Sequence, residues 1–563
     1  MVKQSKRPNL EEEFLQESTE RYPGDTNFQK WGFDLHPQVA PISGGLVILF
    51  IVLTLTFKEQ ASTVFNATLN SIGTYGGWFY ILAANIFLGV VIIFAFSNYG
   101  RIRLGGQDAK PEFSTFAWFA MLLSAGMGIG LMFWSVGEPM FHFTSPPPIF
   151  GSQGGTPDAA STAMTLTFYH WGLHPWGLYA LVGLGLAFFA FNRGLPLTMR
   201  SVFYPLLGER IYGWPGHIID ILAVVADLFG LATSLGLGVQ QVAAGLSFLI
   251  PAIPSEIPTQ VTLIAIITGF ATLSVMAGLD GGVRRLSEWN LYLAAIFMFF
   301  VLVFGPTLFI FDTFVQNIGN YVARFPMLSF WTESFTSDEG GWQNSWTVFY
   351  WGWWISWSPF VGMFIARVSR GRTIREFVMG VLIAPTLLSF LWLSTMGGTA
   401  LDLQLTNTAD IAGAVQENVA TAMFFMLDNL PLTAISSIVG ILLVTIFFVT
   451  SSDSGSLVVD NLTSGGKLDS PVPQRVFWAV MEGVVAAVLL LGGGLEALQA
   501  AAIATGLPFA LVLLIMCYSL NQGLSQELRE LEIEELREAE AKREEKIAMI
   551  MSSRQRAQFA QDE

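Results

Sequence analysis

The chain has 563 residues, of which 13% are charged and 52% are hydrophobic. Soluble globular proteins carry about 25% charged residues, so this content indicates a membrane protein. The formal net charge of −15 lies largely in the two tails, no basic patch predicts a nucleic-acid partner, and a single cysteine excludes a disulfide framework.

Twelve stretches are apolar enough to span a bilayer, which takes about 20 mostly apolar residues. We therefore predict an all-α membrane protein with twelve transmembrane helices, a 1–40 tail, a 41–520 helical domain and a charged 521–563 helix. The stretches lie near 41–57, 79–98, 115–136, 164–192, 217–249, 259–277, 288–311, 345–366, 377–399, 432–452, 476–493 and 500–519.

The basic residues are concentrated in every second connection between these stretches. Fourteen lie in even-numbered connections, against two, Lys58 and Arg324, in odd-numbered ones. Because Lys and Arg gather on the cytoplasmic side, both termini are expected in the cytoplasm. The regular alternation supports the count of twelve, since a missed span would scramble it. The expected location is the cytoplasmic (inner) membrane, as a multi-pass protein surrounded by lipid.

Two further segments have helical patterns but are too polar to span the membrane. The segment from Thr313, TFVQNIGNYVARFPMLSF, mixes polar and apolar residues and is interpreted as an amphipathic helix at the outer interface. The charged run from Ser525 consists of strong helix formers and is interpreted as a solvated cytoplasmic helix. A regulatory or self-association role for it stays open.

The eighth expected span holds four tryptophans in seven residues, in the stretch YWGWWISWSPF. If Arg367 marks its cytoplasmic end, Trp357 lies roughly 15 Å above that end at a rise of about 1.5 Å per residue. This depth does not fit an interfacial belt of aromatic residues. The fourth span carries a second set, FYHWGLHPWGLY, in which Pro175 breaks the regular helix. Packing alone could use any one of these rings, but two sets at mid-membrane favour an aromatic cage.

An aromatic cage suits a quaternary ammonium group. This cation has no N–H donor, so it is held by ring faces rather than by hydrogen bonds. Each contact contributes about 0.5–1 kcal/mol, and about 2 kcal/mol or more when desolvated.

The third span contains SAGMGIGLMFW, in which Gly126, Gly128 and Gly130 alternate at mid-membrane. Close helix packing is one explanation. Each glycine weakens a helix by up to about 1 kcal/mol, so local unwinding is at least as good an explanation. Unwound backbone at this depth is tolerated only where it is buried in protein or lines a cavity, as in transporters with discontinuous helices.

The tenth span ends in IFFVTSSDSGS, where we expect a helix terminus at Asp453 and Gly455. The hydroxyls of Thr450, Ser451 and Ser452, together with backbone carbonyls, would suit Na⁺. Alone, this signal is weak, because such hydroxyls usually bond to their own helix.

The stretches FYWGWWISWSPFVGMFIARVSRGRTIREF, GMGIGLMF and HWGLHPW resemble the betaine/choline/carnitine transporter (BCCT) family. The resemblance covers roughly residues 40–520. It implies a LeuT-like inverted repeat of five plus five helices, about 115–311 and 345–519, with two additional N-terminal helices. It also implies a homotrimer and a secondary active importer of osmoprotective solutes that works by alternating access.

For the substrate, the resemblance implies an ammonium box followed by further aromatic residues along the substrate path. The box residues are Trp171, Trp176, Tyr179 and Trp354, and the path residues are Trp353 and Trp357. Family members that take choline tend to carry an acidic residue at Gly130. Glycine there favours a zwitterion, most simply glycine betaine, whose carboxylate meets backbone N–H groups of Gly126, Gly128 and Gly130. Ser234 is a plausible further contact.

For the coupling ion, the resemblance implies one sodium ion and no cofactor. The residues that match its site are Ser124, Met127, Phe447, Thr450 and Ser451. No basic side chain stands in these stretches, which argues against sodium-independent exchange.

Asp227 departs from the pattern of the sodium-coupled carriers, where a hydroxyl residue would contribute to a second sodium site. An intramembrane carboxylate costs about 2.5–3.5 kcal/mol on insertion scales and is functional by default. No Lys or Arg lies within the fifth span, so a second Na⁺ or a bound proton would balance the charge; we favour Na⁺. A buried structural Asp is the alternative, and Glu138 stays open between a structural and a gating role.

Three readings follow. The first is a Na⁺-coupled importer of glycine betaine or a similar zwitterion. The second is a proton-coupled choline carrier that uses Asp227. The third is an aromatic-lined channel or osmosensor. An enzyme is not expected, because no nucleophile–base arrangement or phosphate loop is present and Pro175 spoils His170 and His174 as a metal-ligand pair.

Overall fold

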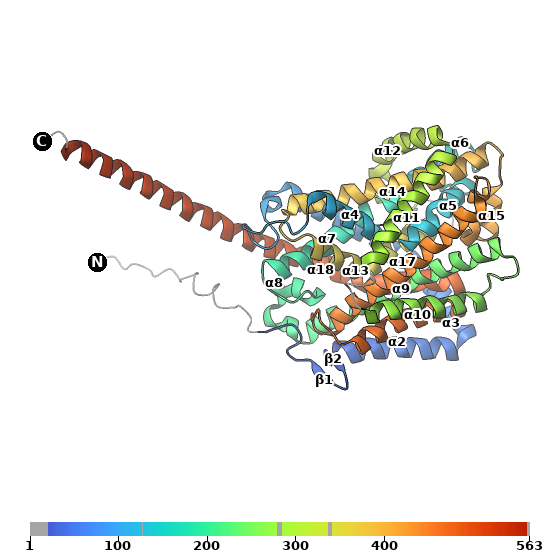
Figure 1. Ribbon diagram of the computed structural model, residues 1–563, viewed down its shortest axis with the longest axis horizontal. Coiled ribbons are helices and arrows are strands. Elements are labelled where there is room, and N and C mark those ends of the chain that lie inside the picture. Colours follow the sequence, from blue (N-terminus) through green and yellow to red (C-terminus); the bar gives the residue numbers. More distant parts are fainter. Residues whose placement is uncertain (1–20, 127, 278–283, 336–340, 560–563) are drawn as a thin grey trace.

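The chain is almost entirely helical (Figure 1). The computed structural model describes residues 21–126, 128–277, 284–335 and 341–559. Within these ranges, nine helices are long and apolar enough to cross a membrane, or ten if the bent pair α4 (Thr115–Gly126) and α5 (Ile129–Thr144) is one span. The predicted all-α membrane class is thereby confirmed.

Long apolar helices form the body of the molecule. Besides α4 and α5, they are α2 (Val39–Thr56), α3 (Lys58–Phe96), α6 (Pro157–Trp171), α7 (Leu173–Phe191), α9 (Trp214–Leu249), α10 (Ile257–Ala277), α11 (Arg284–Phe304), α13 (Phe349–Val368), α14 (Ile374–Leu405), α17 (Thr433–Thr463) and α18 (Val472–Phe559). The connecting elements are β1 (Phe28–Lys30), β2 (Phe33–Leu35), η1 (Asn98–Arg101), η2 (Pro148–Phe150), η3 (Met199–Phe203), α8 (Tyr204–Leu207), η4 (Gly208–Tyr212), α12 (Thr307–Phe330), the π-helical η6 (Asn344–Val348), α15 (Ile411–Glu417), η7 (Val419–Thr421) and α16 (Ala422–Asp428).

Two helices account for the difference between this count and the twelve predicted spans. Tryptophan-rich α13 is 20 residues long but is not among the ten. α18 counts once, although Gly493 and Gly494 inside it have non-helical backbone angles and divide it at a kink. The predicted eleventh and twelfth spans lie on the two sides of that kink.

The third and fourth expected spans are broken helices. The axes of α4 and α5 differ by 64°, and the break falls at the glycine stretch, as the unwinding hypothesis requires. α6 and α7 are separated by Gly172, whose backbone is not helical. Pro175 lies in the first turn of α7, where a missing N–H is tolerated. The break is therefore three residues earlier than the proline that predicted it.

The predicted helix end at Asp453 and Gly455 is wrong, because α17 continues as a helix to Thr463. A Cβ at Gly455 would lie 2.3 Å from a side-chain carbon of Leu231 on α9. The glycine therefore permits close packing of α17 on α9 instead of ending the helix.

The amphipathic segment is a helix, α12, that begins at Thr307, six residues before its predicted start. The preceding span ends at Phe304 instead of residue 311, because Gly305 and Pro306 interrupt the helix. α12 packs against α6 and α14 through buried residues that include Asn317 and Tyr321.

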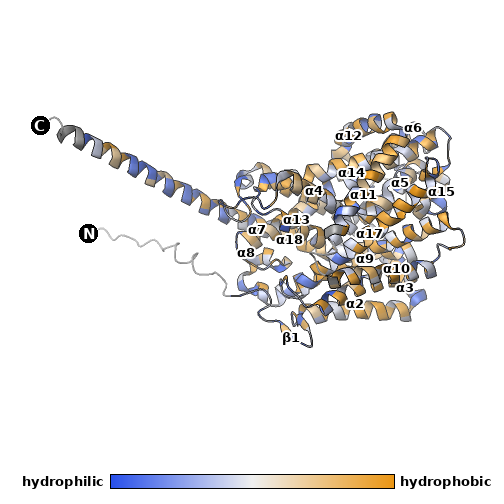
Figure 2. Ribbon diagram, in the orientation of Figure 1, coloured by the Kyte–Doolittle hydropathy of each residue, from blue (hydrophilic) through white to orange (hydrophobic). Residues whose placement is uncertain are grey.

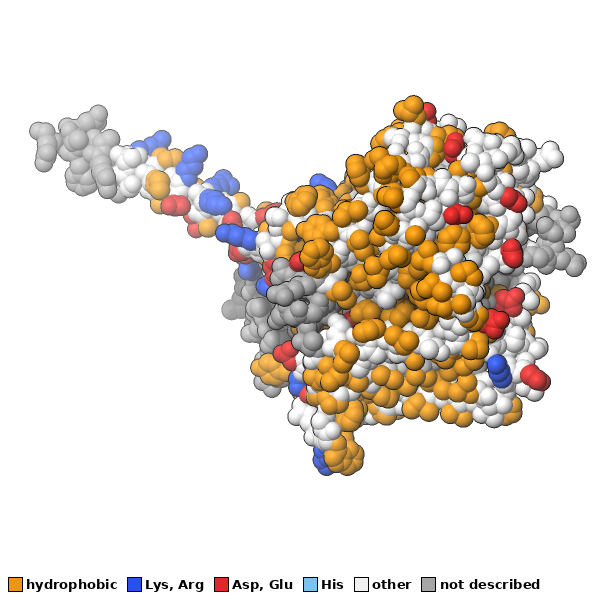
Figure 3. Space-filling model, turned by 45° about the vertical axis from the view of Figure 1, so that its right-hand side comes forward, with side chains coloured by type: hydrophobic (Ala, Val, Ile, Leu, Met, Phe, Trp, Pro, Cys, Tyr) orange, Lys and Arg blue, Asp and Glu red, His pale blue; other side chains and the backbone are white. Residues whose placement is uncertain are grey.

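Burial separates a protein core from an exposed apolar shell. The most apolar window of the α6–α7 pair is 89% buried, and that of α11 only 22%. α13 lies at the centre and packs against α7, α9 and α18. Hydrophobic residues run along most helices (Figure 2), and hydrophobic side chains cover much of the face in Figure 3. Exposed apolar surface of this extent is rare in soluble monomers and fits the membrane class of the protein.

The C-terminal part of α18 projects from the bundle on the side where residues 21–35 lie (Figure 1). Glu527 and Glu530 each pair with Arg193 at 3.0 Å, and Glu535 pairs with Arg101 at 2.9 Å. Beyond these contacts, the helix is exposed as far as residue 554.

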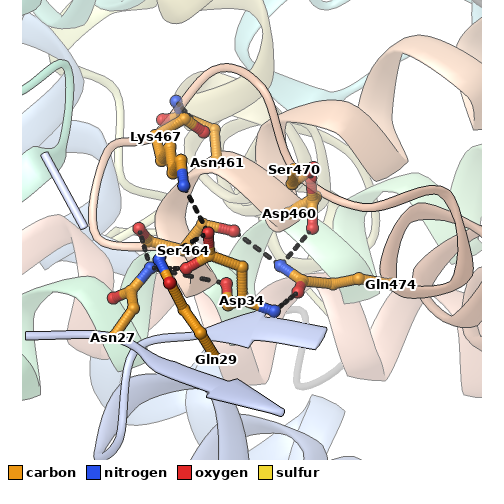
Figure 4. Close-up of polar contacts among 9 residues, drawn as sticks. All are labelled: Asn27, Gln29, Asp34, Asp460, Asn461, Ser464, Lys467, Ser470 and Gln474. Atoms are coloured by element: carbon orange, nitrogen blue, oxygen red, sulfur yellow. Dashed lines mark hydrogen bonds and ion pairs between the residues drawn. The ribbon is translucent and has the colours of Figure 1, made fainter. Parts of the chain in front are cut away.

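The hairpin of β1 and β2 contacts the connection between α17 and α18 (Figure 4). Asp34 is at the centre: its carboxylate accepts a 2.7 Å hydrogen bond from Asn27 and pairs with Lys467. Its N–H donates to Gln474 Oε1 at 3.0 Å, and the Gln474 amide donates to Ser464 Oγ at 2.5 Å. Burial raises the pKa of Asp34, but the hydrogen bonds from Lys467 and Asn27 outweigh it, and the pKa is below its usual value.

His36 follows the hairpin and extends its contacts to the start of α9. Its N–H donates to the Thr463 carbonyl at 2.8 Å, and its Nε2 lies 3.3 Å from Nη1 of Arg200, which pairs with Asp220. Burial and the charges of Arg200 and His217 lower the pKa of His36 to about 3. The folded protein therefore holds this imidazole neutral.

Candidate functional site

The two aromatic sets of the sequence surround one cavity at the centre of the bundle. α6 and α7 contribute one wall, α13 the opposite wall, and the start of α5 and the middle of α9 close it. The predicted residues that line it are Trp171, Trp176, Tyr179, Trp353, Trp354, Trp357, Gly128, Gly130 and Ser234. Leu131, Pro175 and Ser389 also line it without having been predicted, and Gly126 is the last residue of α4.

The rings meet at steep angles around the cavity. The ring centroids of Trp171 and Trp354 are 4.9 Å apart with planes at 71°, and those of Tyr179 and Trp354 are 6.4 Å apart at 78°. Trp353 stacks on Trp354 at 4.7 Å and 14°. These contacts hold four aromatic side chains at fixed orientations, with offset and edge-to-face geometry typical of aromatic pairs.

Three indole N–H groups of the cage have acceptors in the surrounding protein, whereas Trp357 Nε1 and Tyr179 Oη have no hydrogen-bond partner among the described residues. Trp354 Nε1 donates to the His170 carbonyl and Trp353 Nε1 to Ser234 Oγ, both at 3.1 Å. Trp171 Nε1 donates to Glu138 Oε2 at 2.9 Å. Because these polar edges are occupied, the rings present their faces and carbon edges to the cavity.

Gly130 is required by the close approach of two tryptophans. A Cβ at this position would lie 2.5 Å from a carbon of Trp353 and 3.1 Å from one of Trp171. At Gly128 the nearest atom would be a carbon of Trp357, at an ordinary 3.7 Å. The two lining glycines therefore differ: one is forced by packing against the cage, and the other has room for a methyl group.

The space between the rings is narrow and uncharged. Its free volume is about 30 Å³, room for roughly two water molecules. Among the described residues that line it, none carries a charge. A larger solute can enter only if the rings move apart, and a cationic group there would meet ring faces.

Behind Trp171, the buried carboxylate of Glu138 joins α5, α6 and α13. One potential ligand atom from each of Glu138, His142 and His170 lies within 4.8 Å of the other two, a spacing that a metal site would have. Glu138 Oε2, however, already accepts hydrogen bonds from Trp171 and Tyr350, and Oε1 is within hydrogen-bonding distance of both histidines. Sequence reasoning left Glu138 open and missed Tyr350, because partners on three helices have no common spacing in the sequence.

The residues predicted to bind the first sodium ion lie on two elements. Ser124 stands near the end of α4, and Met127 lies outside the described residues. Phe447, Thr450 and Ser451 share about one turn of α17, which packs against α5 and α9. Thr450 Oγ1 donates to the Ile446 carbonyl at 2.9 Å, which leaves its oxygen lone pairs as acceptors.

Asp227 belongs to a group of carboxylates inside the bundle. Its Oδ1 accepts the Phe360 N–H at 3.2 Å, and its Oδ2 has no hydrogen-bond partner in the described part of the chain. Glu482 on α18 is also fully buried, and Asp227 and Asp453 influence it electrostatically. Its Oε2 accepts a hydrogen bond from Ser452. Its Oε1 has no hydrogen-bond partner among the described residues. Glu482 was missed because nothing in the sequence links it to Asp227.

Comparison with known proteins settles what kind of molecule this is. Residues 38–529 match the model of the betaine/carnitine/choline family of transporters. The chain belongs to this family.

Individual relatives of this transporter family cover most of the chain. A glycine betaine/proline/choline transporter of Vibrio parahaemolyticus is 50% identical over 89% of this chain and 92% of its own length. Glycine betaine transporter 1 of the same species is 47% identical, over 91% and 98%. A probable glycine betaine transporter of Desulfitobacterium hafniense is 45% identical, over 86% and 96%. The chain is thus a multi-helix membrane transporter and not an enzyme.

Proposed function

We propose that the protein is a secondary active importer of glycine betaine or a related zwitterionic compatible solute, coupled to Na⁺. The observation that carries this proposal is the uncharged cavity lined by five tryptophans and a tyrosine. Ring faces hold a quaternary ammonium, which offers no hydrogen-bond donor. The names of relatives at 45–50% identity support the same class of substrate.

The carboxylate of the zwitterion would meet the other wall of the cavity. Gly128 and Gly130 lie at the start of α5, a helix of 16 residues. The first N–H groups of a helix have no intrahelical partner and carry a partial positive charge, so they favour an anionic group. Aromatic faces on one side and a helix N-terminus on the other match the two ends of glycine betaine.

The coupling ion would bind beside this wall, between the glycine break and α17. Backbone oxygens of Ser124 and Met127 and oxygens of Phe447, Thr450 and Ser451 form the proposed first sodium site. A second Na⁺ at Asp227, near Glu482, is our preferred account of that charge. A proton bound there would instead make a proton-coupled choline carrier, which is the alternative function.

The number of spans, the inverted repeat, the oligomeric state and the orientation in the membrane are part of the same proposal. Counting α13 and dividing α18 at Gly493 and Gly494 gives twelve spans, arranged as a LeuT-like inverted repeat with α2 and α3 added. The bundle would sit in the inner membrane as a homotrimer with both termini in the cytoplasm, because the basic residues lie on that side. Opening the narrow cavity alternately to each face would constitute alternating access.

Uptake into proteoliposomes tests the proposal. Radiolabelled glycine betaine should accumulate when an inward Na⁺ gradient is imposed and not when a pH gradient is imposed alone. Competing methylated amines should rank by how well they combine a quaternary ammonium with a carboxylate. Accumulation driven by pH without Na⁺ would favour the choline alternative, and flux that neither saturates nor accumulates would indicate a channel.

A further inference from the structure

Glu138 has an environment that no other described carboxylate in the bundle has. It is fully buried, and each of its oxygens has two hydrogen-bond partners. Oε1 lies 2.6 Å from His170 Nδ1 and 3.2 Å from His142 Nε2, and each of these nitrogens donates to it in the tautomer that carries the proton there. Oε2 accepts from Trp171 Nε1 at 2.9 Å and from Tyr350 Oη at 2.5 Å.

This set of partners fits an ionised carboxylate. An anion accepts at about four lone-pair positions and donates at none, and the indole N–H can only donate. The ion-pair partners that the structure gives Glu138 are His142 and His170. His170 is further held by Thr347 Oγ1, 3.0 Å from its Nε2. Glu138 is therefore solvated by four protein donors without a Lys or Arg to cancel its charge.

The network reaches the cage along two paths. Trp171, which donates directly to Glu138, lines the cavity. The ring of Tyr350 stacks on Trp354 at 5.7 Å and 28° and meets Trp171 edge-on at 5.6 Å and 71°. Glu138 itself is not part of the lining, so its charge acts on the cavity through the rings and not by contact with the solute.

A carboxylate in this place strengthens the attraction of the cage for a cation in two ways. An indole N–H that donates to an anion is polarised, which makes the ring face more negative. The negative charge also acts directly across a medium of low dielectric, where Coulomb interactions are strong. Neither effect attracts a solute group that has the shape of a quaternary ammonium but no charge.

We propose that Glu138 is a positioning and specificity-determining residue: from behind Trp171 it makes the cavity select a quaternary ammonium over a neutral group of equal size. This inference rests on the proposed function. Glu138 makes the cavity selective for positive charge although no residue of the lining is charged. The ammonium group of a zwitterion can then bind without forming an ion pair with a protein carboxylate.

The test compares glycine betaine with 3,3-dimethylbutanoate, in which a carbon atom replaces the nitrogen. The two share size, shape and carboxylate and differ only in the positive charge. Affinities of both would be measured by tryptophan fluorescence on purified protein. Glu138→Gln, which keeps the shape of the side chain, should weaken glycine betaine roughly tenfold and leave 3,3-dimethylbutanoate unchanged or slightly tighter. The ratio of the two affinities should therefore fall about tenfold.

Two further variants separate charge from structure. Glu138→Asp keeps the charge on a shorter side chain, so both affinities can fall while their ratio stays near that of the wild type. Tyr350→Phe keeps the carboxylate and breaks only the hydrogen bond of the second path, so the ratio should fall less than in Glu138→Gln. A ratio in Glu138→Asp as low as that expected for Glu138→Gln contradicts the proposal even if Glu138→Gln fails to fold.

Loss of both affinities by the same factor in Glu138→Gln would show that the residue only supports the fold, and would overturn the proposal. A wild-type protein that does not bind glycine betaine contradicts the proposed function instead. A wild type that binds glycine betaine and 3,3-dimethylbutanoate equally well contradicts the inference alone. The three failures are thus distinguishable.

Discussion

The aromatic cavity and the carboxylates around Asp227 are both buried in the bundle, but their polar groups differ in kind. In the cavity, Trp171, Trp353 and Trp354 donate their N–H groups to protein acceptors, and the groups left without a partner among the described residues, Trp357 Nε1 and Tyr179 Oη, are neutral. Asp227 and Glu482 each keep one oxygen without a hydrogen-bond partner among the described residues.

This difference separates the two proposed ways of binding a cation. The cage is held in shape by its own hydrogen bonds and ring contacts, so its affinity would depend on geometry. Under the proposed Na⁺ coupling, the carboxylates would carry a charge that the surrounding protein leaves only partly balanced, and isolated buried charges are costly. Their affinity would therefore depend on charge. Changes of shape should damage the first region, and changes of charge the second.

Removing a ring should have the largest effect. Trp354→Ala deletes a desolvated cation–π contact of about 2 kcal/mol and should weaken glycine betaine roughly thirtyfold in a tryptophan fluorescence titration. Trp354→Phe should lose less. Trp289, which is 71% exposed on α11, provides a matched control: Trp289→Ala should bind like the wild type. Equal affinities for Trp354→Ala and the wild type would mean that the cage is assigned to the wrong ring.

Adding one methyl group tests the same geometry. Gly130→Ala places a carbon 2.5 Å from Trp353 and displaces the ring, so glycine betaine affinity should fall about tenfold or more. Gly128→Ala finds its nearest neighbour at 3.7 Å and should change affinity little. If isothermal titration shows both variants equally impaired, the loss comes from stiffening the glycine break and not from the cage.

Removing hydroxyl ligands should act on the ion and spare the cage. Thr450→Ala with Ser451→Ala deletes both side-chain oxygens of the proposed first sodium site. The Na⁺ concentration for half-maximal uptake should rise about tenfold, which corresponds to about 1.4 kcal/mol. Fluorescence titration at saturating Na⁺ should still detect glycine betaine. An unchanged Na⁺ dependence would place the coupling ion elsewhere.

Neutralising a carboxylate changes charge with little change of shape. With a second Na⁺ at Asp227, Asp227→Asn should lower the Hill coefficient for Na⁺ toward one, and Glu482→Gln should do so less strongly. With a proton there, wild-type uptake should respond to an imposed pH gradient and Asp227→Asn should not. A variant with wild-type Na⁺ and pH dependence would make Asp227 structural.

The smallest effect concerns stability near the hairpin. Since the pKa of His36 is lowered to about 3, the unfolded chain takes up a proton below its ordinary pKa of about 6.5 while the folded protein does not. Stability should therefore fall as the pH drops from about 6.5 toward 3, by roughly 1 kcal/mol at pH 5.5. His36→Gln should flatten the melting temperature over this range. An identical acid profile for both proteins would contradict the assignment.

Sequence reasoning worked best where local pattern decides structure. The aromatic residues at mid-membrane and the broken third span could be predicted because tryptophan density and alternating glycines have few local explanations. Gly455 could not be read correctly, since a glycine that ends a helix and one that admits Leu231 look alike in sequence. The boundary between α11 and α12 was misplaced, although Gly305 and Pro306 mark it.

Contacts between distant elements were out of reach. Glu138 draws its partners from α5, α6 and α13, and Glu482, which is influenced electrostatically by Asp227, lies on a helix some 250 residues further along the chain. Each residue could be recognised as a buried carboxylate, but its neighbours are set by the packing of the helices. No pattern in one sequence links such positions.

The hairpin at Asp34 has a consequence for the order of assembly. Its partners, Lys467 and Gln474, come more than 430 residues later in the chain. Since a chain is synthesised from its N-terminus, the hairpin has no place to dock until α17 and the start of α18 have been made. This N-terminal hairpin is therefore among the last segments to reach its native contacts, and it docks only after the helices of the bundle have come together.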